Sequence, residues 1–75
     1  MNWFVEQRMD WIADMLAVYG FINRVHLVRK FRVSEAQAAL DFKRFNEMNP
    51  DAMRYDSRKK IYLAKTSPPS LLEKL

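Results

Sequence analysis

The spacing of apolar residues along the chain predicts helices first. Residues 3–19 carry apolar side chains at helical spacing, interrupted by single charged residues. Gly20 follows, and glycine readily takes the left-handed conformation that ends a helix. Phe21 and Ile22 are too few for another helix and are compatible with a very short strand. The apolar face of this amphipathic helix is formed by Trp3, Phe4, Met9, Trp11, Ile12, Met15, Leu16 and Tyr19.

Two shorter helical patterns follow between Asn23 and Phe45. Asn23 is a typical capping residue for the first of them, whose apolar side is formed by Leu27, Val28 and Phe31. Arg32 and Val33 then form a tight turn, with Val33 packed beneath it. Two helices joined in this way are typical of a helix-turn-helix, which presents its second helix outward.

The second of these helices has its own start signal. The Ser34 hydroxyl can accept a hydrogen bond from a free backbone N–H, and the side chain of Gln37 can reach back to the N–H of Ser34, which together form a capping box. Ala38, Phe42 and Phe45 then recur along one buried stripe. The outward side carries Ala36, Gln37, Leu40, Lys43, Arg44 and Glu47.

The remaining pattern predicts a hairpin. Pro50 ends the third helix, and residues 53–55 and 61–63 alternate around a polar turn that contains three adjacent cations. The expected fold is therefore mainly α with a small β-hairpin: a winged helix-turn-helix of three helices plus a wing, over residues 1–65. Residues 66–75 are a C-terminal tail or the start of a linker.

Composition narrows the class of protein. The 75 residues suffice for one domain, and the absence of cysteine excludes disulfides and thiol chemistry. No apolar run is long enough to span a membrane, so the expected location is cytoplasmic. With one glycine, no metal-ligand partners for His26 and no nucleophile near Asp10 and Asp14, we expect no enzyme activity, no cofactor and no metal.

The positive charge is unevenly distributed. The net charge of the chain is +4, yet residues 1–22 hold one cation and three carboxylates. Residues 23–45 hold six cations and two carboxylates, and residues 46–65 hold five cations and three carboxylates. This distribution suits a phosphate-binding surface, although a solvated surface would also explain it.

Several spaced motifs resemble one known family. They are Gly20-x-Ile22-Asn23-Arg24-x-x-Leu27, Phe31-x-Val33-Ser34-x-x-Gln37-Ala38-x-x-Asp41, Pro50, Tyr55-Asp56 and Lys60-x-Tyr62. The resemblance covers roughly residues 11–64. This order resembles the N-terminal winged-helix domain of bacterial WYL-domain transcriptional regulators, the group that includes repressors of phage-defence islands. The resemblance implies a dimeric, operator-binding repressor whose third helix enters the major groove.

The candidate site residues follow from the predicted faces. A base-reading group lies on or near the third helix: Ser34, Gln37, Ala39, Leu40 and Arg44. A phosphate-binding group surrounds it: Arg24, Arg32, Lys43, Arg58, Lys59 and Lys60. Gln37 is alternatively only a cap. The surplus apolar residues Trp3 and Phe4 either cover the core or form a dimer surface, together with Leu71 and Leu72 in the tail.

The leading hypothesis is sequence-specific binding of double-stranded DNA by a repressor that acts as a homodimer on an inverted repeat. No membrane partner is expected. The alternative is a winged-helix protein-interaction module, such as a phage or mobile-element factor that binds and blocks a host regulator.

Overall fold

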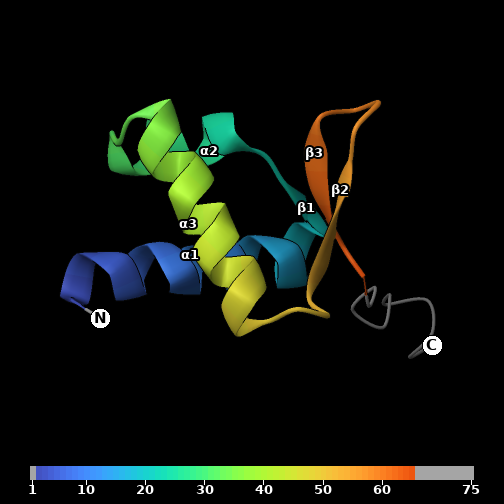
Figure 1. Ribbon diagram of the computed structural model, residues 1–75, viewed down its shortest axis with the longest axis horizontal. Coiled ribbons are helices and arrows are strands. Elements are labelled where there is room, and N and C mark those ends of the chain that lie inside the picture. The colour runs from blue at the N-terminus through green and yellow to red at the C-terminus, as the bar shows by residue number, and fades with distance from the viewer. Residues whose placement is uncertain (1, 66–75) are drawn as a thin grey trace.

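The protein folds into three helices packed against a small antiparallel sheet (Figure 1). The computed structural model describes residues 2–65. The elements follow in the order α1 (Trp3–Tyr19), β1 (Phe21–Ile22), α2 (Arg24–Phe31), α3 (Glu35–Met48), β2 (Met53–Asp56) and β3 (Ile61–Ala64). The spatial strand order is β1-β3-β2, with Phe21 opposite Leu63 and Tyr55 opposite Tyr62. The predicted winged-helix architecture is confirmed, including the two-residue strand β1.

Helix α1 begins and ends at local signals. Asn2 Oδ1 accepts from the Val5 N–H at 2.9 Å, and Gly20 takes a left-handed φ of 80° while its N–H donates to the Leu16 carbonyl at 3.0 Å. Its buried stripe consists of Met9, Ile12 and Leu16. In the described residues no helix is long and apolar enough to cross a membrane.

The predicted apolar face of α1 is too broad. Trp3, Phe4 and Tyr19 are 62%, 67% and 65% exposed, so they do not cover the core. Tyr19 is the last residue of the helix, and Trp3 and Phe4 lie at the end of α1 farthest from the sheet (Figure 1). The buried stripe of α1 runs only from Met9 to Leu16, so helical spacing alone overestimates what the two ends of the helix bury.

The helix-turn-helix is formed by α2 and α3. Arg32 ends α2 in the left-handed region with a φ of 56°, and Val33 packs against the core beneath the turn, as predicted. Ser34 Oγ accepts from the Gln37 N–H at 3.0 Å, which confirms the predicted start of α3.

The reciprocal half of the predicted capping box is wrong. The side chain of Gln37 does not return to Ser34, because its Nε2 donates to Asp41 Oδ1 at 3.0 Å. The complete capping box belongs to α2 instead. There Asn23 Oδ1 accepts from the His26 N–H at 3.1 Å, and His26 Nδ1 accepts from the Asn23 N–H at 3.3 Å.

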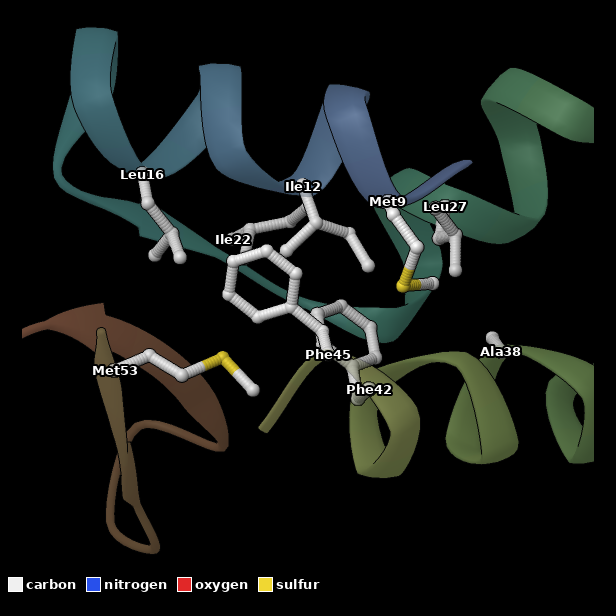
Figure 2. Close-up of a cluster of buried hydrophobic side chains, with 9 residues drawn as sticks. All are labelled: Met9, Ile12, Leu16, Ile22, Leu27, Ala38, Phe42, Phe45 and Met53. Carbon is white, nitrogen blue, oxygen red and sulfur yellow. The ribbon is translucent and has the colours of Figure 1, made fainter. Parts of the chain in front are cut away.

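One apolar core joins all the helices to the sheet (Figure 2). Phe42 of α3 lies at its centre and stacks on Tyr62 of β3, with ring centroids 4.3 Å apart and planes 8° from parallel. This stack attaches the hairpin to α3 and so sets the position of the wing beside that helix. The buried apolar residues are Met9, Ile12, Leu16, Ile22, Leu27, Ala38, Phe42, Phe45 and Met53.

Candidate nucleic-acid interface

The outward face of α3 carries polar and apolar side chains in alternation. Leu40 is 57% exposed, with Lys43 and Arg44 exposed beside it. Gln37 and Ala39 are half-buried at the edge of this face. The predicted outward position is therefore confirmed for Leu40, Lys43 and Arg44, whereas Gln37, also predicted to lie outward, is half-buried.

The beginning of α3 is accessible. Ser34 and the first residues of the helix are exposed, and Ser34 Oγ already accepts from the N–H of Gln37. The free backbone N–H groups and the positive end of the helix dipole favour an anion at such a terminus.

A buried ion pair lies beneath this face, and the sequence analysis missed it. Asp41 is completely buried, and its Oδ2 lies 2.6 Å from Nε of Arg8 on α1. Its Oδ1 accepts from Arg8 Nη2 at 3.3 Å and from Gln37 Nε2 at 3.0 Å. Asp41 falls on the same stripe as Ala38 and Phe45, so the residue spacing along α3 indicated that it would be buried. No sequence pattern indicated that Arg8 is its partner, because Arg8 lies 33 residues away.

The tip of the hairpin exposes three cations, Arg58, Lys59 and Lys60. Asp56 orders the turn, because its Oδ1 accepts from the backbone N–H of Arg58 at 2.9 Å and from that of Lys59 at 3.1 Å. The hydrogen bond from Lys59 is the main cause that lowers the pKa of Asp56 below its ordinary 3.8. The tip and the beginning of α3 both point to the upper edge of Figure 1.

A groove of about 410 Å³ separates α3 from the hairpin. It is lined by Ala39, Phe42, Lys43, Asn46, Pro50, Met53, Arg54, Tyr55, Tyr62 and Lys65. The lining thus contains three cations and no carboxylate. Of these cations only Lys43 was predicted. Arg54 and Lys65 join it because the stack of Phe42 on Tyr62 draws the hairpin against α3, and Lys65 also lies 4.0 Å from Asp51.

The other predicted phosphate ligands surround α3. Arg24 is exposed at the start of α2. Ile22, two residues earlier, lies opposite Tyr62 of β3, so the start of α2 lies beside the hairpin. Burial raises the pKa of Tyr62, and the charge of Arg24 partly offsets this effect. Arg32 is exposed at the end of α2, in the turn that precedes α3.

The predicted dimer surface is only partly described. Trp3 and Phe4 contact each other edge to face at 5.1 Å, and both line a groove of about 360 Å³ with Phe31 and Val33. Leu71 and Leu72 lie outside the described residues.

The helix-turn-helix, the stacked hairpin with its basic tip and the exposed face of α3 define a winged helix-turn-helix domain. Residues 5–72 match the model of the BrxR transcriptional regulator winged helix-turn-helix domain, and the chain belongs to this family. This membership confirms the predicted resemblance to the winged-helix domain of a transcriptional regulator.

The curated relatives are similar over most of this chain. The DNA-binding transcriptional repressor CapW of Stenotrophomonas maltophilia is 34% identical over 64 residues, which are 85% of this chain and 21% of the relative. CapW of Escherichia coli (strain KTE188) is 35% identical over 81% of this chain and 20% of the relative. CapW of Pseudomonas aeruginosa is 33% identical over 88% and 22%. The chain thus spans about a fifth of the length of these relatives.

Proposed function

We propose that this chain is the DNA-reading domain of a transcriptional repressor and binds double-stranded DNA with sequence preference. Helix α3 enters the major groove, and the hairpin tip lies over the neighbouring backbone or minor groove. The observation that carries the proposal is the cationic groove without carboxylates between α3 and the hairpin, next to an exposed helix face that carries both polar and apolar side chains. The name of the relatives, DNA-binding transcriptional repressor, supports it.

The side chains divide into two roles in this proposal. Base edges are read by the residues on or beside the outward face of α3: Ser34, Gln37, Ala39, Leu40 and Arg44. The phosphates are held by cations around it: Arg24, Arg32, Lys43, Arg58, Lys59 and Lys60. Since phosphate contacts supply most of the affinity and base contacts supply the preference, the two groups can be separated by experiment.

Selection of bound duplexes from a random pool tests the proposal, followed by binding of the selected duplex across a salt series. With about five phosphate contacts, the slope of log affinity against log salt is expected on the order of −4 to −5. Lys59→Ala should weaken binding to all duplexes similarly and make the slope less steep by about 1, whereas Gln37→Ala should change the preference at one base pair. Absence of enrichment would contradict sequence-specific binding.

We further propose that the repressor acts as a homodimer on an inverted repeat, with Trp3 and Phe4 at the contact between copies. Their exposure and their place beside an apolar groove support this contact. Sedimentation of the protein and of its Trp3→Ser, Phe4→Ser variant tests it, and a loss of the dimer in the variant is expected. Val18→Ser is the control, because Val18 is 70% exposed on the same helix. A selected site without a repeat would contradict the dimer.

A protein partner is the second candidate function. The observation that favours it is Leu40, which exposes an apolar side chain in the middle of the outward face of α3. Binding to a protein that persists in high salt and is lost in Leu40→Ser would support this alternative, whereas binding to DNA should decline steeply with salt.

A further inference from the structure

The amide of Gln37 has a defined orientation. Its Nε2 donates to Asp41 Oδ1 at 3.0 Å, one turn further along α3. An ionised carboxylate has no N–H or O–H to donate, so the amide must turn its NH₂ group toward Asp41. The carbonyl oxygen Oε1 is then the polar atom of Gln37 that is not committed to Asp41. In a half-buried side chain beside the outward face of α3, this oxygen is available to a ligand.

Asp41 is itself fixed in position, so it keeps its hydrogen bond to Gln37. It is completely buried, and Arg8 holds both of its oxygens, with Nε at 2.6 Å from Oδ2 and Nη2 at 3.3 Å from Oδ1. The Arg8 side chain is itself only 12% exposed. A two-point contact between guanidinium and carboxylate fixes direction as well as distance. Helix α1 therefore holds the carboxylate that in turn holds Gln37.

A buried ion pair contributes little net free energy to the packing of two helices. Its desolvation cost often equals or exceeds its Coulombic gain, and an apolar pair of similar volume is frequently as stable. Stability alone thus explains this pair poorly. The third hydrogen bond to Asp41, from a side chain at the proposed DNA surface, offers a better reason for it.

We propose that Asp41 and Arg8 are positioning residues that hold the Gln37 amide with its carbonyl oxygen toward DNA, so that Gln37 selects a base that carries an amino group in the major groove. This inference rests on the proposed function. Adenine N6 and cytosine N4 are such groups, whereas guanine and thymine offer only acceptors and a methyl group on that edge. One N–H of Nε2 remains free and can complete a two-point contact with N7 of adenine.

The first test identifies the base and then removes its amino group. Selections with the protein and with Gln37→Met, which is similar in length but cannot hydrogen-bond through an amide, locate the position that Gln37 reads. The base there should be adenine or cytosine, and its analogue without the amino group should bind the protein roughly 10- to 100-fold more weakly. Gln37→Met should bind both duplexes equally. Guanine or thymine at this position, or equal binding of the two duplexes by the protein, would overturn the inference.

The second test removes the hold on the amide without leaving a buried charge. In the double variant Arg8→Met, Asp41→Leu, apolar side chains replace the pair, so the free energy of unfolding should be unchanged or higher. The affinity for unrelated DNA should change less than about twofold, because neither residue is a proposed phosphate ligand. The preference at the Gln37 position should fall to under about threefold, because the amide can then rotate. Arg8→Lys is the matched control: lysine keeps a cation beside Asp41 but loses the two-point contact, so this variant should retain more of the preference than the double variant. A folded double variant with its preference intact would overturn the role of the pair.

A third variant keeps the experiment decisive if the double variant does not fold. Asp41→Asn preserves size, and its Oδ1 can still accept from Arg8, so it should disturb the fold less than Asp41→Ala does. Its Nδ2 can donate to Gln37, so the Gln37 amide can turn over and present its NH₂ group. We expect this variant to bind duplexes with guanine or thymine at the position as well as it binds the selected one, and unchanged preference would count against the inference. If the unaltered protein selects no sequence, the proposed function itself fails. If it selects a sequence but is indifferent to the amino group, only this inference fails.

Discussion

The first turns of α2 and α3 begin with the same capping interaction, but the side chain of the third residue makes a different contact in each helix. Each begins with a polar residue whose side-chain oxygen accepts from the N–H three residues later: Asn23 Oδ1 from His26 at 3.1 Å, and Ser34 Oγ from Gln37 at 3.0 Å. In α2 the His26 side chain returns to the Asn23 N–H and closes the box. In α3 the Gln37 side chain turns along the helix to Asp41.

The third residue of each helix therefore has a different role. His26 stabilises the start of α2, whereas Gln37 places its side chain at the proposed DNA surface. The capping box at the start of α2 satisfies the N–H groups of Asn23 and His26 within the same turn, so it needs no other element. The start of α3 leaves the Ser34 N–H without the side chain that a capping box would offer, and the side chain so released lies at the proposed DNA surface. A buried carboxylate joined to α1 is what diverts it.

Removal of the Asp41 carboxylate should have the largest effect on the free energy of unfolding. Asp41→Ala leaves the Arg8 guanidinium largely buried without its partner, and such a change costs about 3–5 kcal/mol of unfolding free energy. Denaturant unfolding measures it. Arg8→Met, Asp41→Leu is the control and should recover most of the loss, whereas a loss below about 1 kcal/mol in Asp41→Ala would mean that this pair is not well desolvated.

Removal of the capping residue of each helix should show which cap contributes more to the free energy of unfolding. Asn23→Ala removes the side chain that caps α2 and frees His26, at a cost of roughly 1–2 kcal/mol of unfolding free energy, toward the upper part of the range for N-cap residues. Ser34→Ala removes one hydrogen bond from an exposed cap and should cost about 1 kcal/mol or less. Equal costs in thermal or denaturant unfolding would show that the closed box at α2 adds nothing.

Substitution of the third residue of each helix sharpens the contrast. His26→Ala leaves the part-buried Asn23 N–H without its acceptor and should cost about 1 kcal/mol of unfolding free energy. Gln37→Ala breaks no cap, and Asp41 keeps Arg8, so the cost should be smaller. Unfolding of both variants in urea measures the difference. If Gln37→Ala lost more unfolding free energy than His26→Ala, the side chain of Gln37 would be important for stability, contrary to this contrast.

The hairpin turn should show the smallest effect, and a dependence on pH. Backbone N–H groups lower the pKa of Asp56 in the folded protein, so its contribution to stability is present above the ordinary value of 3.8 and is lost as the pH falls through the lower, folded value. Thermal unfolding between pH 5 and pH 2 should therefore differ between the protein and Asp56→Asn. The difference should shrink at the acidic end of this range. A constant difference would indicate that the charge of Asp56 does not order the turn.

Much of the candidate interface could be predicted because exposure on a helix follows its period. Leu40, Lys43 and Arg44 lie outward as their spacing required, and the alternation of residues 53–55 and 61–63 located the hairpin and its basic tip. The same reasoning failed at Tyr19 and left open whether Trp3 and Phe4 cover the core, because a period describes a face but not how far along the helix that face is covered. The groove was missed because its two walls belong to α3 and the hairpin, which contact only in the folded chain.

The sequence by itself determined where the helices begin and end. Gly20, Asn23, Ser34 and Pro50 act on backbone groups within a few residues of themselves, so their effect needs no distant partner. Only the tertiary structure decided which cap closes and which side chain is left at the proposed DNA surface. The deciding carboxylate is held by Arg8, 33 residues away, and such a contact arises only when α1 packs on α3.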